Sequence, residues 1–428
     1  MPSRLDPALC AKCKGVKRLC GRPRCPILKR IEESLKVTSK ISRRVLFGAS
    51  PPSVLVGEYA YPRVTLGPLA CPISGVEAKE YEDYKSWWGR KTIDDIIRIR
   101  ASMVYSRFNL RVSEARSIRN RLLETTQELA LSTLPVDAEF FFKKPPKPIL
   151  SFDGILSPIG PRASLLELKV VQNPVVPRKV DRIVDDTDVK ATDAVAELYS
   201  SGISYYHITR LFSLGLLGEK RRRRLVPTRW SITAVDSILG DRLLEKVKDF
   251  PEVSEILLFR AEYIGNKYSL IFLPRAWSFE MVEIWLPRSV WVRATKPYIT
   301  VNYELKDGRW RRPGVDGGYH AIRFPVLEYL YRVKRQATVI AIREVSPEYY
   351  APVGSWQIRE SVRNALKSPP TKPESLSSAL KEVSRSLQTD IKVVISESFL
   401  LKALLHTASI LKYLDRERLF KGESSVQK

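Results

Sequence analysis

Residues 10–26 read CAKCKGVKRLCGRPRCP, and this stretch decides how the start of the chain folds. It holds four of the five cysteines, at the spacing C-x2-C-x6-C-x4-C. Because so short a segment has no apolar core, a bound metal has to supply its folding free energy. Structural Zn²⁺ takes four thiolates in tetrahedral geometry. We therefore predict a zinc site with Cys10, Cys13, Cys20 and Cys25 as ligands.

The alternatives for these cysteines are two disulfides, four unrelated thiols or an Fe–S cluster. The sequence shows no secretory signal ahead of them, and disulfides are rare in the cytosol. No apolar run approaches the ~20 residues that cross a bilayer. We therefore expect a soluble, cytoplasmic protein that carries zinc and has no membrane partner.

The charge of the chain is strongly one-sided. Its 72 Lys and Arg outnumber 47 Asp and Glu, which gives a formal net charge of +25. A basic excess of this size predicts a polyanionic partner, with DNA first and an anionic membrane surface second. The charged surface of a thermophilic protein is the alternative, but such a surface normally gains both signs of charge.

Three segments concentrate the positive charge. Residues 1–44 hold thirteen Lys and Arg against three acidic residues, residues 220–224 read KRRRR, and a looser cluster spans 309–343. Each cation that neutralises a phosphate releases a counterion, so such clusters give salt-dependent affinity for nucleic acid. A solvated run of charge is the alternative for 220–224.

The periodicity of apolar residues changes several times along the chain and predicts an α+β fold. Helical patterns cover 92–99 and 112–131, the latter with Ser113 as its cap, whereas 165–171 and much of 255–342 are typical of strands. We divide the chain into a zinc finger and basic helix (1–44), the N-terminal part of an α/β body (45–185), a helical hairpin with a basic wing (186–240), a β-rich region (241–367) and C-terminal helices (368–428).

The order of patterns in 186–240 is typical of a winged helix-turn-helix unit. Helical patterns over 189–199 and 204–214 are followed by the basic run and by a strand-like segment, 225–230. The basic run would then lie on a hairpin that apolar neighbours such as Trp230 anchor to a core. A plain helical hairpin without a DNA-reading role is the alternative.

Arginine suits phosphate because its guanidinium donates two parallel hydrogen bonds. A tryptophan between cations suits a stacked base, and Trp310 within GRWRRP matches that pattern best. His207 lies on the second predicted helix of the hairpin, where it can reach a phosphate or serve only as a surface residue. The residues that we predict to contact DNA are Arg210, Lys220, Arg221, Arg222, Arg223, Arg224, Arg229, Trp310, Arg311 and Arg312.

No catalytic motif is recognisable in the sequence. It contains no Walker A loop, G-x-G-x-x-G fingerprint or H-E-x-x-H pair. Asp181, Asp185, Asp186 and Asp188 are candidates for holding Mg²⁺, although acids ahead of a helix more often serve as caps. Whether the chain is an enzyme stays open at this point.

Beyond the cysteines, three longer strings stand out: VGEYAYP at 56–62, RRLVPTRWSITAVD at 223–236 and PVGSWQIRE at 352–360. Together with the cysteine pattern they resemble the archaeal Nre family of DNA repair proteins, over most of the chain. The resemblance implies a role in DNA damage repair, a C4-type zinc finger at the N-terminus and docking onto the sliding clamp.

Residues 419–428 lack the order of Gln, aliphatic and paired aromatic residues that a clamp-docking peptide needs, so we do not expect clamp binding through one. Gln357, Arg359 and Glu360 in the third string are candidates for lining a pocket. We favour a zinc-stabilised DNA-binding protein of DNA repair, with other repair proteins as further partners. The alternative is a DNA- or nucleotide-modifying enzyme of the repair machinery, either a nuclease or an NAD-using transferase.

Overall fold

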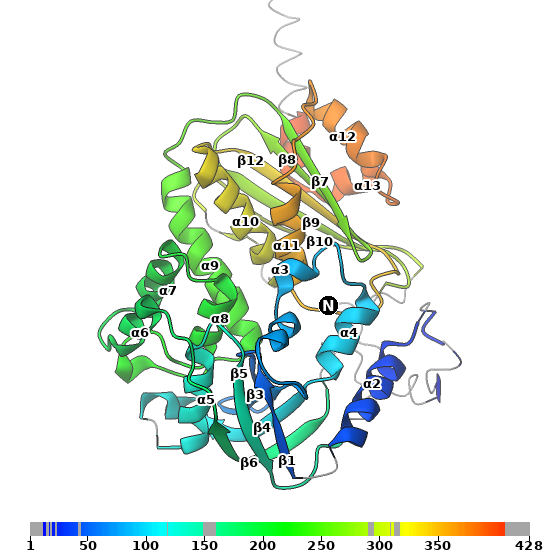
Figure 1. Cartoon of the computed structure of the whole chain (residues 1–428). Helices are drawn as coiled ribbons and strands as arrows, with labels where there is room; N and C mark the ends of the chain where they lie inside the picture. Colours follow the sequence, from blue (N-terminus) through cyan, green and yellow to red (C-terminus); the bar gives the residue numbers. More distant parts are fainter. Residues whose placement is uncertain are drawn as a thin grey trace, which may run out of the picture.

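The structure is a computed structural model of the 428-residue chain, and it describes residues 12–13, 17, 19–21, 24–41, 44–117, 119–148, 160–289, 295–308, 310–311 and 317–406. Two six-stranded sheets and the helices around them make up this part of the chain, which confirms the expected mixture of α and β structure (Figure 1). Within these ranges, every helix is too short or too polar to span a bilayer.

The first sheet belongs to the N-terminal half of the chain. Its strand order is β1-β5-β6-β4-β3-β2, with β4 and β6 parallel and the other neighbours antiparallel. Residue 49 also bonds through its backbone to residues 71 and 73, just past β3, so the sheet curls back on itself. The strands are β1 (Val45–Ser50), β2 (Val54–Val56), β3 (Arg63–Ala70), β4 (Val104–Arg111), β5 (Val136–Phe142) and β6 (Arg162–Val170).

Short helices surround this sheet: α2 (Pro26–Lys40), η1 (Val76–Tyr81), α3 (Tyr84–Trp87), α4 (Ile93–Ala101), η2 (Val112–Arg116) and α5 (Arg121–Leu131). The single helix predicted over 112–131 is wrong, because η2 and α5 are separate. Asn120, rather than Ser113, caps α5, since its Oδ1 accepts from the backbone N–H of Leu123 at 3.2 Å.

A group of four helices follows: α6 (Arg178–Asp185), α7 (Ala191–Ser200), α8 (Tyr205–Ser213) and α9 (Thr228–Val247). The predicted helical hairpin is confirmed as α7 and α8. The strand predicted over 225–230 is wrong, so the basic wing is not formed. Pro227 occupies the N-cap position of α9, because proline lacks the N–H that a strand ladder needs and suits the start of a helix.

The second sheet has the order β11-β10-β9-β12-β8-β7, with β9 and β12 parallel. Helices α10 (Gly317–Val333) and α11 (Trp356–Ala365) pack on one face, and α12 (Leu376–Ser384) and α13 (Ile391–Glu397) pack on the other (Figure 1). The strands are β7 (Leu257–Tyr263), β8 (Asn266–Leu273), β9 (Ser278–Trp285), β10 (Tyr298–Glu304), β11 (Trp310–Arg311) and β12 (Thr338–Val345). Strand β12 is buried along its whole length, as expected between two helical layers.

In the second half, β7, β8, β9, β10 and β12 confirm much of the strand pattern predicted between 255 and 342. The β-rich prediction for 241–367 missed α10 and α11, because their Tyr, Ile and Val residues favour strands locally but pack on the sheet as helices. The predicted C-terminal helices are confirmed as α12 and α13 in the part of 368–428 that the structure describes. Helix α9 leads directly from the helical group into the second sheet, and its side packs against α10 (Figure 1). This helix therefore connects the two halves of the chain, and the candidate site lies at its start. Residues 407–428, which include the C-terminal peptide, lie outside the described ranges.

Candidate nucleic-acid interface

The basic run lies between α8 and α9, where Lys220–Arg222 form one short 3-10 turn, η3. Arg221 and Arg222 expose 81% and 73% of their side chains, and Lys220 and Arg224 are also exposed. The Nε atoms of Arg221 and Arg222 lie 3.3 and 3.2 Å from the same carboxylate oxygen of Glu219. One carboxylate shared by two guanidinium groups leaves an excess of positive charge on this turn.

Arg223 points the other way and anchors the run. Its Nε donates to the carbonyl of Gly218 at 2.8 Å, and its Nη2 donates to the carbonyls of Val184 at 2.8 Å and Asp186 at 3.0 Å. Burial lowers the pKa of this guanidinium. A cation at the carbonyl end of α6 also interacts favourably with the helix dipole. Arg223 therefore holds the turn in place, while its neighbours face solvent.

The backbone on either side of the run is also fixed. The N–H of Leu225 donates to the carbonyl of Val112 at 2.9 Å, and the N–H of Val226 donates to the carbonyl of Ser213 at 2.8 Å. Gly215 has a φ of +66°, and a Cβ there would lie 2.7 Å from the carbonyl oxygen of Arg224. Only glycine permits this close approach without strain.

The start of α9 lies against the segment that follows β2. The N–H of Val56 donates to Oγ1 of Thr228 at 2.9 Å, and Nη1 of Arg229 lies 3.4 Å from Oε1 of Glu58. The ring centroids of Tyr61 and Trp230 are 5.0 Å apart, at an interplanar angle of 48°. Two segments that are remote in the sequence therefore form one surface.

Trp230 does not anchor the run to a core as the sequence suggested. Its side chain is 44% exposed, and its partner Tyr61 is 44% exposed as well, while the neighbouring Tyr59 is fully exposed. Leu225, with 1% exposure, is the buried anchor of this segment. The helix that begins at Thr228 turns Trp230 outward, whereas the predicted strand placed it inward.

Two further arginines reach the same edge from the first sheet. Arg63 at the start of β3 pairs in register with Arg111 at the end of β4, and the N–H of Val112 donates to the carbonyl of Pro62 at 3.0 Å. Both side chains are exposed. We define the basic surface as the exposed arginines and rings that these contacts bring together: Tyr59, Tyr61, Arg63, Arg111, Arg221, Arg222, Arg224, Arg229 and Trp230.

The sequence analysis missed Tyr59, Tyr61, Arg63 and Arg111. The pairing of β3 with β4 joins Arg63 to Arg111, 48 positions later, and no local pattern predicts such a contact. The one available signal was the repetition of tyrosine in VGEYAYP, which is unusual for a segment rich in glycine and proline turns.

The structure places the other predicted DNA-contacting residues away from the basic surface or leaves their side chains undescribed. Arg210 packs against the end of α5, where its Nε donates to the carbonyl of Ala130 at 3.0 Å and its Nη2 to that of Ser132 at 2.8 Å. Trp310 and Arg311 form β11 beside β10, and nothing further is described of their side chains. Arg312 lies outside the described residues.

His207 is buried next to Arg210. Its Nε2 lies 3.1 Å from the carbonyl oxygen of Ala130, so this nitrogen carries the proton of the neutral ring. Burial, followed by the nearby charge of Arg210, lowers the pKa of His207 to about 2. The imidazole is therefore neutral at physiological pH and holds α8 against α5.

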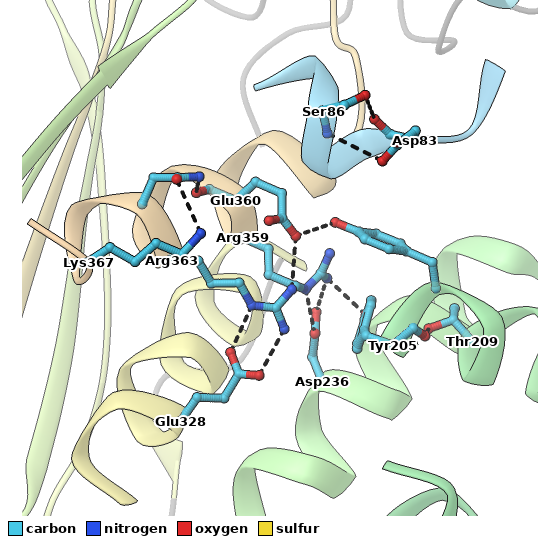
Figure 2. Close-up of polar contacts among 12 residues, drawn as sticks. Asp83, Ser86, Tyr205, Thr209, Asp236, Glu328, Arg359, Glu360, Arg363 and Lys367 are labelled. Carbon is cyan, nitrogen blue, oxygen red and sulfur yellow. Dashed lines mark hydrogen bonds and ion pairs between the residues drawn. The ribbon is translucent and has the colours of Figure 1, made fainter. Parts of the chain in front are cut away.

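Two of the residues predicted to line a pocket, Arg359 and Glu360, belong to a buried polar network (Figure 2). The guanidinium of Arg359 in α11 donates to both carboxylate oxygens of Asp236 in α9, at 3.0 and 2.6 Å, and to the hydroxyl of Tyr205 at 2.9 Å. Both charged side chains are at most 1% exposed. Burial alone would lower the pKa of Arg359, but the carboxylate of Asp236 raises it well above its ordinary value.

The neighbouring residues extend this network toward α10. Glu360 accepts from the hydroxyl of Tyr206 at 2.8 Å and pairs with Arg363 at 2.9 Å, and Arg363 also donates to both oxygens of Glu328 (Figure 2). Gln357 is fully buried and accepts from Tyr268 at 2.9 Å. These side chains join helices from both halves of the chain.

A surface cavity of about 390 Å³ lies elsewhere, between α4 and the turn that joins β7 to β8, and neither Gln357, Arg359 nor Glu360 lines it.

In the acidic cluster at 181–188, the side chain of Asp186 holds the turn between α6 and α7 and caps neither helix, because α7 begins at Ala191 without a side-chain cap. One carboxylate oxygen of Asp186 accepts from the N–H groups of Asp188 at 2.9 Å and Val189 at 3.0 Å. These hydrogen bonds lower the pKa of Asp186. The described residues contain no group of three or more His, Cys, Asp or Glu side chains that could hold a metal ion.

Three of the four clustered cysteines fall in the described part of the chain, and Cys10 lies outside it. Cys13, Cys20 and Cys25 are free thiols rather than half-cystines. Cys13 is buried, and its Sγ accepts from the N–H of Leu19 at 3.4 Å. Cys25 takes the N-cap position of α2, with Pro26 as the first helical residue.

Comparison with known families identifies the relatives of this chain. Residues 19–292 match the family described as Archaeal Nre, N-terminal, and residues 304–413 match Archaeal Nre, C-terminal. The chain belongs to the archaeal Nre family.

Three relatives support this assignment. The chain is 40% identical to DNA repair protein NreA of Archaeoglobus fulgidus, over 89% of this chain and 94% of the relative. It is 34% identical to DNA repair protein NreB of the same organism, over 92% and 97%. It is also 36% identical to DNA repair protein NreA of Haloferax volcanii, over 81% and 84%. No solved structure matches the chain significantly.

The strings that carry the Nre resemblance meet in the structure. VGEYAYP at 56–62 contacts the start of α9, which belongs to the string at 223–236. The last residue of that second string, Asp236, pairs with Arg359 in the third string, 352–360. In this Nre protein, α9 therefore links the basic surface at one end to the buried ion pair further along.

Proposed function

We propose that this Nre protein binds DNA as part of DNA repair, and that the basic surface makes the contact. The relatives are named DNA repair proteins. The observation that carries the proposal is the convergence of exposed arginines from three segments, at β3, β4 and the start of α9, around exposed aromatic rings. Guanidinium groups suit phosphates because each can donate two parallel hydrogen bonds.

The test is the salt dependence of DNA binding. The full chain is titrated against a fluorescent oligonucleotide by anisotropy, between about 50 and 300 mM NaCl. Each phosphate contact adds about 0.7–0.9 to the slope of log K against log salt. Replacing Arg221, Arg222 and Arg224 by alanine lowers that slope by about two to three and weakens binding at least tenfold at low salt.

A matched control changes the same amount of charge elsewhere. Lys381, Arg385 and Lys392 are exposed at the opposite end of the molecule, on and beside α12 and α13. Their triple alanine variant keeps the affinity and the salt slope of the unmodified chain within twofold. Equal losses in the two variants, or an affinity that ignores salt, would overturn the proposal.

We also propose that Cys10, Cys13, Cys20 and Cys25 hold a structural zinc ion. The proposal is supported by the spacing of the four cysteines and by the free thiol state of the three described ones, none of which is used in a disulfide. The purified chain should contain one zinc per molecule by atomic emission. Cys13→Ser should lower this well below one, whereas Cys71→Ser, in a separate buried cluster, should not. Full zinc content in Cys13→Ser would refute the site.

A further inference from the structure

The basic surface exposes aromatic rings, and this feature goes beyond what phosphate contact needs. Among the tryptophans whose side chains the structure describes, Trp230 is the exposed one, because Trp87, Trp277, Trp285 and Trp356 are at most 7% exposed and Trp88 is partly covered. A tryptophan held at 44% exposure loses hydrophobic stabilisation that a core position would give it. Its position is therefore better explained by contact with a partner.

Cations surround the rings. Trp230 follows Arg229 directly, and Arg63 lies two residues beyond Tyr61 in the chain, opposite Arg111 across the β3–β4 ladder. Rings interleaved with guanidinium groups are typical of proteins that bind single-stranded nucleic acid, since bases stack on the rings while cations follow the backbone. In a duplex, the faces of the bases are already stacked on one another and only their edges are accessible.

Among the described residues of this region, the winged helix-turn-helix unit predicted to read a duplex is not formed. Helix α8, the second helix of the predicted helix-turn-helix unit, has six of its nine residues buried. It packs against α5, α7 and α9, and the two side chains on it that could reach DNA, His207 and Arg210, are bound to the carbonyl of Ala130 instead. The predicted wing is replaced by the start of α9.

We propose that the basic surface selects single-stranded DNA, with a base stacked on Trp230 and Tyr61 and the adjoining phosphates on Arg63, Arg111 and Arg229. This inference rests on the proposed function and narrows it to one class of substrate. The Tyr61–Trp230 pair is already placed by the Val56–Thr228 hydrogen bond, so little ordering entropy is lost when a base binds.

The experiment compares a 20-nucleotide oligothymidine with a 20-base-pair duplex at the same salt, using the full chain and anisotropy. Single-stranded DNA should bind at least tenfold more tightly. Trp230→Ala should weaken single-strand binding about 5- to 150-fold, the range expected for loss of one stacked base, and change duplex binding less than twofold. Trp230→Phe, which keeps a ring, should recover most of the loss.

Tyr331→Ala is the matched control, because Tyr331 is an aromatic residue of similar exposure on α10, far from the basic surface in the chain. It should leave both affinities unchanged. Circular dichroism checks that each variant is folded. An abasic oligonucleotide of the same length should bind the unmodified chain and Trp230→Ala equally, because it offers phosphates without bases.

The outcomes separate this inference from the proposed function. Equal affinity for the two DNA forms, or an equal loss for both in Trp230→Ala, overturns the single-strand inference while DNA binding stands. Failure to bind either DNA in dilute buffer overturns the proposed function itself.

Discussion

The buried pair of Asp236 and Arg359 gives the sharpest prediction about stability. Both side chains are at most 1% exposed, and the guanidinium donates to both carboxylate oxygens. Asp236→Asn keeps the shape of the side chain but leaves the charge of Arg359 uncompensated in the core. Removing one partner of such a pair costs about 3–5 kcal/mol in the free energy of unfolding.

The comparison uses an exposed ion pair between α9 and α7. Arg242 and Asp193 are each 46% exposed, so Asp193→Asn should cost no more than about 1 kcal/mol. Unfolding in guanidinium chloride, followed by fluorescence and circular dichroism, gives both values. The double variant Asp236→Leu/Arg359→Met removes both charges and should recover most of the loss. A loss in Asp236→Asn as small as that in Asp193→Asn would refute this account of the pair.

Three further predictions follow from local geometry and electrostatics. Folding lowers the pKa of His207 from 6.5 to about 2, so below pH 6.5 the unfolded chain binds a proton that the folded chain does not. The free energy of unfolding should therefore fall by about 1.4 kcal/mol for each pH unit below 6.5. His207→Gln should remove this pH dependence from unfolding measurements at about pH 5.5–7.5. Gly215→Ala should lower the free energy of unfolding in guanidinium chloride by at least about 2 kcal/mol, because Gly215 has a positive φ and a Cβ there would lie 2.7 Å from its neighbours. Gly202 also has a positive φ but lies in open space, so Gly202→Ala should lower it by only about 1 kcal/mol. Glu219→Gln removes the carboxylate shared by two arginines and should tighten DNA binding about two- to fivefold at 50 mM salt but not at 300 mM, as measured by anisotropy.

Local signals in the sequence predicted much of the fold. The α7–α8 hairpin followed from the apolar spacing over 189–199 and 204–214, because a helix depends on residues that are close in the chain. The strand predicted over 225–230 was wrong because Leu225 and Val226 favour strands, whereas Pro227 at the N-cap position starts α9. A long-range contact decided where Trp230 points, and the sequence carried no direct signal for it.

The same limit applies to the candidate site. An arginine in a helix normally faces solvent, so nothing local marked Arg359 as a core residue. Its burial depends on Asp236, which lies 123 positions earlier and arrives on a different helix. Likewise, the sequence showed the basic run at 220–224 but not which of its arginines faces inward. Arg223 turns inward because it donates to carbonyls at the end of α6, which are remote in the sequence.

The contacts that position the start of α9 beside the basic surface differ from the ion pair that holds α9 in the core, and variants can test the two sets separately. Thr228 is fixed by the N–H of Val56, and Leu225 by the carbonyl of Val112, both independent of the ion pair at Asp236. Well below its unfolding temperature, Asp236→Asn should therefore keep its DNA affinity within about twofold, because each 1.4 kcal/mol in binding would be a tenfold change. Thr228→Val, which lacks the oxygen that accepts from Val56, should weaken DNA binding at little cost in global stability. A large loss of DNA affinity in folded Asp236→Asn would instead mean that the Asp236–Arg359 ion pair sets the position of α9, and through it the position of the arginines on the basic surface.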